Sequence, residues 1–349
     1  MVPHQFSPLV LNNSGAFDAD QREIVDAYLR IGAARALHFG LTDTTTPESA
    51  QETLEFYASP VTDFVKDCWL LRRGNDIVGF LLVLAPATAH GVRITCLIDP
   101  TLREYKDLIQ SSLEFSKDWV KRNADKFGYG GEVRIQFEVL DEDTIAASVF
   151  KENGLMVQSF DERMCKNLNL EANEPCFDEI KERLADLGFA IHTSISPQHH
   201  HMLYKSFKHA FSHVKRINEM DFDSFVRGVI QETSLHIVVW DARRNSIVAA
   251  ALVKDFKGEA VALDYIWVQK ELRGRGVGGL LMRAVFAELK GRRYSKVELD
   301  MDQNNTTGAR RLYEKVGMTK VHGFKFWGDV VVIWLTSQDG AKRQSRLLL

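Results

Sequence analysis

The feature that most constrains the fold of this chain is an internal repeat at a separation of 170 residues. WLLRRGNDIVGFLLVLAP (69–86) and HIVVWDARRNSIVAAALVK (236–254) each join two apolar runs through a short polar turn, the pattern of a β-hairpin. At this separation Ile77-Val78 aligns with Ile247-Val248. Further on, FKENGL (150–155) aligns with YEKVGM (313–318) at a separation of 163, which places about seven extra residues in a loop of the first half. We therefore predict two copies of one fold.

The order of elements in each copy favours a mixed α/β fold. Each half reads as a helical opening, a hairpin, a strand, a long helix, a strand, a helix and a closing strand pair. LNLEANEP (168–175) interrupts the strand-like alternation with Asn, Glu and Pro and is the expected linker. We predict two tandem domains, 1–170 and 171–349, each a mixed, mostly antiparallel sheet flanked by helices.

Composition and charge argue against several classes of function. The 44 basic and 47 acidic residues are spread along the chain and give a net charge of -3, so we expect no nucleic-acid or anionic-membrane partner. The four cysteines include no CxxC pair, which argues against a zinc site or a disulfide framework. The sequence shows neither a signal-peptide pattern nor an apolar run of membrane-helix length. We expect a cytoplasmic protein, monomer or homodimer, with no metal.

Five histidines lie in PQHHHMLYKSFKHAFSH (197–213). His209 and His213 have the i, i+4 spacing of a metal pair on a helix, but no carboxylate completes a recognisable ligand set. We expect a partly exposed helix. Its aromatic residues Tyr204, Phe207 and Phe211 are candidates for pocket walls, with core packing the more common role for the two phenylalanines.

RGRGVGG (273–279) lies between a predicted strand and a predicted helix. VALDYIWV (261–268) is rich in β-branched and aromatic residues, and apolar residues recur at helical spacing after Val277. Glycines at a helix start let backbone N–H groups approach a phosphate, and Arg273 and Arg275 would add charge-assisted contacts. From the glycines alone, an ordinary strand-to-helix turn is the more common explanation.

The sequence around this turn resembles the GNAT superfamily of acyl-CoA dependent N-acetyltransferases. The family loop, Gln/Arg-x-x-Gly-x-Gly/Ala, is matched by Arg273, Gly276 and Gly278, and the strand KVELDMD (296–302) follows. The motif Asn-x-Thr-Gly-Ala-x-x-Leu-Tyr is met by Asn305, Thr307, Gly308, Ala309, Leu312 and Tyr313. The resemblance covers residues 236–335 and is only architectural over the first half. The tandem arrangement is similar to that of mycothiol synthase and related double-domain acetyltransferases.

This resemblance implies acetyl-CoA as cosubstrate. The residues that it places against acetyl-CoA are Trp267, Val268, Arg273, Gly274, Arg275, Gly276, Val277, Gly278 and Asn305. Main-chain N–H groups at Trp267 and Val268 would bind the thioester carbonyl, and Asn305 would either cap the last helix or contact the pantetheine arm. Tyr313 would act as general acid toward the departing thiolate, with a packed aromatic as the alternative role.

The general base is less defined by the sequence. Asp264 interrupts an apolar strand, and strict alternation would place it on the face of Ile266 and Val268. A structural Asp that caps a neighbouring backbone group is the alternative. Many family members carry Glu two residues earlier, where this chain has Ala262. Glu259, or a water relay without a dedicated base, stays open.

The first copy has lost the features of the second. REYKDLI (103–109) stands at the position of RGRGVGG without a glycine, and we expect it to continue a helix with Glu104 and Asp107 where a pyrophosphate would lie. Phe150 stands at the position of Tyr313. We therefore expect a non-catalytic first domain and a second domain that acetylates a primary amine of a small molecule or peptide by direct attack in a ternary complex. The alternative is a non-catalytic acyl-CoA binding or regulatory protein.

Overall fold

The described residues of the chain form two compact units. The computed structural model describes residues 4–9, 21–41, 45–58, 64–86, 91–123, 131–169, 175–231, 233–255, 260–305 and 307–333. The first unit comprises the described residues within 1–41, 53–159 and 324–349, and the second those within 42–52 and 160–323. The expected linker falls mostly on residues 170–174, which lie outside the described residues, as does Glu259.

The first unit is a sheet in the order β1-β2-β3-β4-β5-β12, antiparallel except for the parallel pair β4–β5. Five of its strands come from the first half of the chain: β1 (His4–Pro8), β2 (Phe64–Arg73), β3 (Asp76–Pro86), β4 (Gly91–Ile98) and β5 (Gly131–Leu140). Its helices are α1 (Gln21–Phe39), α3 (Tyr105–Arg122) and α4 (Thr144–Glu152), and α2 (Pro47–Ala58) spans the division between the units. Successive residues of β3 lie on opposite faces of the sheet. Leu81 packs with α3 on one face, whereas on the other face the ring centroid of Phe80 lies 5.2 Å from that of Tyr28 on α1.

The second unit is a sheet in the order β6-β11-β10-β9-β8-β7, again with one parallel pair, β10–β11. Its strands are β6 (Met156–Asn167), β7 (Ala190–His192), β8 (Leu235–Asp241), β9 (Ser246–Asp255), β10 (Ala260–Val268) and β11 (Lys296–Asp302). Its helices are α5 (Phe177–Asp186), η2 (Pro197–His199), α6 (His200–Ala210), α7 (Lys215–Glu219), α8 (Phe222–Phe225), η3 (Val226–Ile230), η4 (Lys270–Leu272), α9 (Val277–Gly291) and α10 (Ala309–Lys315).

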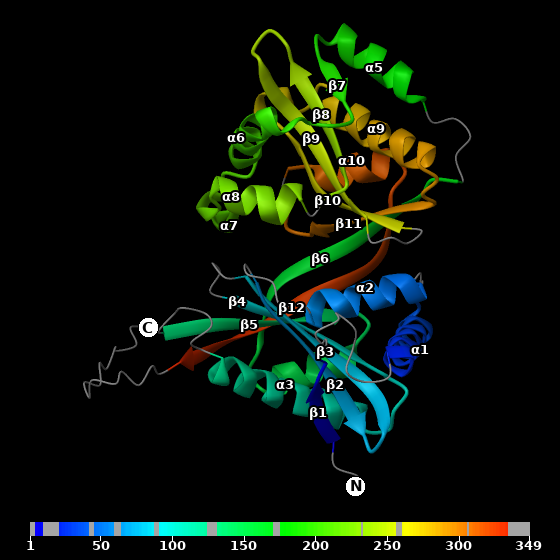
Figure 1. Cartoon of the computed structure of the whole chain (residues 1–349), viewed down its shortest axis with the longest axis vertical. Helices are drawn as coiled ribbons and strands as arrows, with labels where there is room; N and C mark the ends of the chain where they lie inside the picture. Colours follow the sequence, from blue (N-terminus) through cyan, green and yellow to red (C-terminus); the bar gives the residue numbers. More distant parts are fainter. Residues whose placement is uncertain are drawn as a thin grey trace, which may run out of the picture. The chain divides into compact units, whose positions relative to one another are not determined.

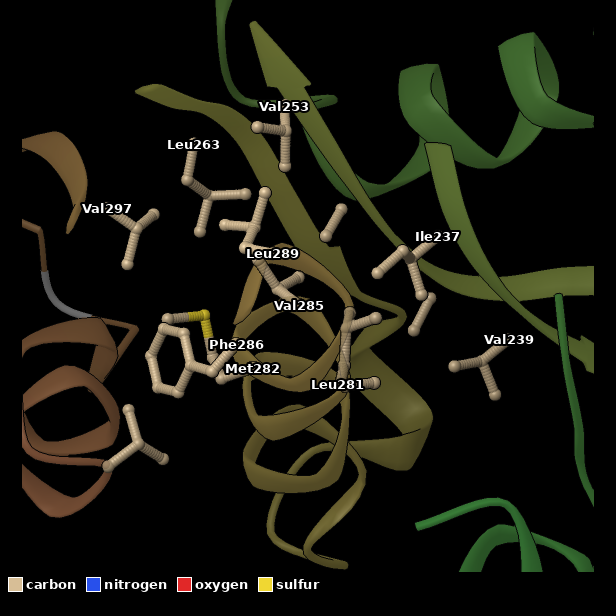
Figure 2. Packing of buried hydrophobic residues seen from close by; sticks show 14 of the residues in the cluster. Ile237, Val239, Val253, Leu263, Leu281, Met282, Val285, Phe286, Leu289 and Val297 are labelled. Carbon is tan, nitrogen blue, oxygen red and sulfur yellow. The ribbon is translucent and has the colours of Figure 1, made fainter. Parts of the chain in front are cut away.

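Helix α9 forms the core of the second unit together with one face of this sheet. Leu281, Val285 and Leu289 recur on one side of the helix and lie among side chains of β8, β9 and β10 (Figure 2). The opposite face of the sheet carries α6, whose Phe207 is fully buried. Within the described residues, no helix has the length and apolar character needed to cross a membrane. These layers agree with the predicted fold class.

The closing strands of the two halves are exchanged between the sheets (Figure 1). Strand β6, from the end of the first half, pairs with β11 from Lys296↔Asn167 to Asp302↔Asp161. Strand β12 (Thr319–Ile333), at the end of the second half, pairs with β5 from Phe324↔Leu140 to Ile333↔Gly131. The expected closing strand pair in each half was therefore wrong, because each half ends in one long strand. Local alternation predicts a strand and does not name the sheet that it joins.

Candidate active site

Strands β10 and β11 separate soon after they begin. They pair over only three positions, Ala260–Ala262 with Lys296–Glu298. Beyond these positions β10 runs to Val268 along β9, while β11 runs to Asp302 along β6. Among the described residues, the edge of β10 that faces away from β9 therefore has no strand partner over its second half. An open strand edge of this kind can bind an extended ligand through backbone N–H and C=O groups.

A β-bulge interrupts β10 at Asp264. The β9–β10 ladder passes from Leu263↔Val253 to Tyr265↔Leu252, which leaves Asp264 as an extra residue. Leu263 and Ile266 consequently pack against the same hydrophobic cluster, although strict alternation would separate them. The prediction that Asp264 lies on the face of Ile266 and Val268 was therefore wrong, because the bulge breaks the alternation of β10. Asp264 is exposed at the bulge, a feature that often redirects a side chain beside an active site.

The glycines of the turn serve two different purposes. Gly274 and Gly276 adopt left-handed backbone conformations, with φ of 77° and 84°. Gly276 is the N-cap of α9, and no side chain caps this helix end. The first-turn N–H groups thus lack a side-chain acceptor, and the helix dipole adds positive potential there. Gly278 instead permits close packing, since a Cβ would lie 3.2 Å from Cδ2 of Leu312 on α10.

The charged residues of the turn lie outside the core. All four residues from Arg273 to Gly276, which include both arginines of the turn, are exposed. Nε of Arg273 donates a hydrogen bond of 3.1 Å to the carbonyl oxygen of Val268. This bond ties the turn to the end of β10 while the rest of the guanidinium stays available to an anion.

Tyr313 lies on α10 with its ring in the core next to α9. The residue is 7 % exposed, and burial raises the pKa of its phenol to about 12. The hydroxyl is consequently neutral at physiological pH and retains its proton for donation. The packing of Leu312 against Gly278 joins this helix to the first turn of α9.

Asn305 shapes the loop before α10 and does not cap the helix. Its Oδ1 accepts hydrogen bonds from the backbone N–H of Thr307 at 2.8 Å and from Oγ1 of Thr307 at 2.5 Å. The N-cap of α10 is Gly308, with φ of 81°. Of the two expected roles of Asn305, helix capping was therefore wrong, and a contact to the pantetheine arm stays a prediction.

Comparison with known proteins identifies this arrangement. Residues 200–318, which include β10, the turn, α9 and α10, match the sequence model of the Acetyltransferase (GNAT) family. These residues form a GNAT acetyltransferase domain. The protein is thus an acyltransferase, as the resemblance implied. No curated protein gives a significant match.

Solved structures show that the GNAT fold extends over both units. A GCN5-related N-acetyltransferase from Sphaerobacter thermophilus is similar over 96 % of this chain and 98 % of its own, with a TM-score of 0.73 and 17 % identity. A tandem GNAT protein from the clavulanic acid biosynthesis pathway is similar over 94 % of this chain and 99 % of its own, with a TM-score of 0.66 and 17 % identity. At these identities the likeness concerns the fold, and it confirms the tandem arrangement.

The first unit keeps the GNAT sheet, but its strands separate later than those of the second unit. Its β3–β4 ladder runs in step from Gly79↔Ile98 to Leu84↔Arg93, with no residue in the place of Asp264. Strand β4 also stays paired with β5 over five positions, from Gly91↔Arg134 to Thr95↔Glu138. The first copy therefore has neither the bulge nor the early separation of strands seen in the second.

The helix start of the first unit is also unlike that of the GNAT domain. Helix α3 begins at Tyr105, so the expectation that 103–109 continues a helix was wrong for residues 103 and 104. Its N-cap residue is Glu104, whose carboxylate accepts a hydrogen bond of 2.6 Å from Arg73. Phe150, at the position of Tyr313, is buried with its ring centroid 4.8 Å from that of Phe137. The carboxylate of Glu104 makes no capping hydrogen bond to the helix, but it places a negative charge at this helix start, where α9 has a glycine.

A buried polar network holds the end of β10 in the GNAT domain, and sequence reasoning missed it. Nε1 of Trp267 donates to Oγ of Ser206 at 2.9 Å. Nε2 of Gln269 donates to the carbonyl oxygen and to Oγ of the same serine, at 2.9 and 2.8 Å. Oε1 of Gln269 lies 2.5 Å from Nδ1 of His209, so this nitrogen carries the proton. The only sequence signal for it is the repeat, which aligns Gln269 with Asp99.

The same pair of positions is joined in the first unit. Arg30 of α1 and Asp99 form an ion pair at 3.6 Å, and Arg30 donates to the carbonyl oxygen of Ile77 at 2.6 Å. Arg30 lines a cavity of about 490 Å³ beside the hairpin turn of the first unit, and His209 and Gln269 line one of about 500 Å³ in the second. Because His209 bonds Gln269, it is committed to this network. Within the described ranges, no three His, Cys, Asp or Glu side chains gather as a metal site.

The aromatic residues expected to line a pocket belong to the core. Phe207 is fully buried, with ring centroids of Trp267 and Tyr265 at 5.5 and 5.2 Å. Tyr204 donates its hydroxyl proton to the carbonyl oxygen of Met220 at 2.7 Å. Phe211 is partly buried in the same cluster. Core packing is therefore the observed role of Phe207.

Proposed function

We propose that the second unit transfers an acetyl group from acetyl-CoA to a primary amine of a small molecule or peptide, by direct attack in a ternary complex. The observation that carries this proposal is the pairing of an open β10 edge with an uncapped α9 start on one strand-turn-helix segment. The pantetheine arm is extended and carries amides that suit a strand edge. The pyrophosphate suits backbone N–H groups at a helix start.

The reaction requires a bound carbonyl, a neutral amine and a proton for the leaving thiolate. The backbone N–H of Val268 polarises the thioester carbonyl, because alternation along β10 directs it to the open edge, whereas the N–H of Trp267 faces β9. The amine nitrogen attacks, the C–N bond forms, and the C–S bond breaks as the electron pair moves to sulfur. Tyr313 supplies the proton to the thiolate, because its buried phenol is neutral.

The proton released by the amine needs an acceptor. Asp264 is exposed at the bulge, halfway along the strand whose edge binds the thioester in this proposal. It accepts this proton directly or through one water. In the same proposal the protein works in the cytoplasm, as a monomer or homodimer, without metal and without a nucleic-acid partner.

The test is release of free thiol from acetyl-CoA with a panel of amino sugars, polyamines, amino acids and peptides, with the acetylated product identified by mass. Gly276→Glu places a carboxylate at the uncapped helix end and is expected to abolish CoA binding. Gly188→Glu is the matched control, because Gly188 has a similar φ of 85° and open surroundings. Tight CoA binding without thiol release from any acceptor would favour the non-catalytic acyl-CoA binding protein.

A further inference from the structure

Two buried charged side chains of β6 contact the two ends of α10, the helix that carries Tyr313. At its first turn Arg310 forms an ion pair with Glu162, which also lies 3.2 Å from Nζ of Lys320. At its C-terminal end Nζ of Lys166 donates a hydrogen bond of 2.9 Å to the carbonyl oxygen of Val316, the C-cap residue. Glu162 and Lys166 are only 4 % and 3 % exposed. Ionised side chains are rarely buried this deeply without a specific partner.

Lys166 also lies over α9. Its Nζ is 5.0 Å from the ring centroid of Phe286, the geometry of a cation–π contact. The lysine thus joins the strand, the long helix and the end of α10 at one point. Tyr313 lies between the two attachments, at residues 310 and 316, and its ring enters the same core as Phe286.

The strand that supplies both side chains comes from the first half of the chain. β6 ends at Asn167, before the expected domain boundary between residues 170 and 171. It nevertheless pairs with β11 along the whole length of that strand, at the edge of the second unit's sheet. The helix with the proposed acid is therefore attached to a strand that the other copy contributes. The first half of the chain therefore contributes to the GNAT domain through β6, and this role requires no ligand site in the first unit.

The equivalent position in the first unit has a different partner. In the second unit, Lys166 pairs with Val297, whose other neighbour is Val261. In the first unit, Asp329 of β12 pairs in the same way with Ile135, whose other neighbour is Val92, so Asp329 holds the position equivalent to Lys166. Asp329 forms an ion pair of 2.7 Å with Lys117 of α3. Both copies have a charged side chain at this position of the strand. Only in the second unit does that side chain contact the end of the short helix, α10.

We infer that Lys166 and Glu162 are positioning residues, through which the exchanged strand β6 holds α10 so that Tyr313 reaches the leaving sulfur. The inference rests on the proposed role of Tyr313 as proton donor. A helix of seven residues has few internal hydrogen bonds, so its position depends on contacts at its ends. Small displacements of a catalytic group have large effects on rate.

The first experiment compares Lys166→Met with Asp329→Asn in the full chain. Methionine keeps an unbranched chain over Phe286 and removes the donor to Val316. We expect kcat to fall about 10-fold to 100-fold, with KM for acetyl-CoA changed by less than about threefold. Asp329→Asn is expected to leave both constants unchanged. In a Tyr313→Phe background, Lys166→Met is expected to cause no further loss of kcat.

The second experiment is amide hydrogen exchange, which needs no turnover. Lys166→Met and Glu162→Gln are each expected to lower protection in residues 309–316, and Asp329→Asn is not. Unchanged protection there would overturn the inference, as would an equal loss of kcat in the presence and absence of the Tyr313 hydroxyl. If the wild-type protein releases no thiol with any amine, the proposed function fails, and the exchange data alone decide whether β6 holds α10.

Discussion

The α-carbon of Gly278 lies so close to Leu312 that an added methyl group would stand 3.2 Å from its Cδ2 atom. This contact joins the start of α9, where the phosphate is proposed to bind, to α10, which carries Tyr313. The two proposed parts of the site therefore share one packing contact.

Gly278→Ala is expected to move α10 slightly and to lower the free energy of unfolding by about 1–2 kcal/mol, because Leu312 must shift. Its neighbour offers the control, since a Cβ on Gly279 meets nothing within 4 Å. Gly279→Ala is expected to be neutral or to stabilise by about 0.4–1 kcal/mol. Urea denaturation of both variants measures the difference, and equal effects would show that the contact is not tight.

Because Tyr313 is buried, the free energy of unfolding is expected to fall at alkaline pH. The phenol has a pKa raised from 10.0 to about 12, so the folded state favours its neutral form. This contribution is complete below pH 10, and is lost as pH rises from 10 to 12, where the unfolded chain ionises first. We expect wild-type stability to fall over this interval by about 2–3 kcal/mol more than that of Tyr313→Phe. Parallel curves for the two proteins would contradict the burial of this hydroxyl.

The network around Gln269 is expected to support CoA binding. Gln269→Leu removes the side-chain partner of His209 and one of the two donors to Oγ of Ser206, and is expected to cost about 1–3 kcal/mol of stability. Because Gln269 follows Val268 directly, we also expect weaker binding of CoA, measured by calorimetry. Asp99→Leu removes the equivalent residue of the first unit and is expected to lower stability without changing CoA affinity. Equal affinities for Gln269→Leu and wild type would assign the network a purely structural role.

The number of CoA sites per chain follows from the contrast between the units. The N-cap of α3 is Glu104, which places a carboxylate at this helix start, whereas the N-cap of α9 is Gly276. Equilibrium dialysis with CoA is expected to give one site per chain, and Gly276→Glu is expected to give none. A second site that survives in Gly276→Glu would show that the first unit also binds the cosubstrate.

The sequence predicted the elements of the site and missed its irregularities. β10, α9 and β11 follow from alternation, helical spacing and the glycine turn, which are local signals. The bulge at Asp264 depends on how β10 pairs with β9, and the bond between Gln269 and His209 joins residues that lie 60 positions apart. Neither leaves a local pattern. The repeat aligns Gln269 with Asp99, but without the structure neither helical partner is known.

The exchange of β6 and β12 has a consequence for synthesis on the ribosome. β5 is complete at residue 140, yet its neighbour β12 begins only at residue 319 and is therefore synthesised after the whole GNAT-matching segment 200–318. Throughout that interval β5 lacks its partner strand on this edge, and an open strand edge favours pairing with other nascent chains. A premature stop codon just before β12 would spare nearly all of the GNAT domain, and would remove a strand from the sheet of the first unit.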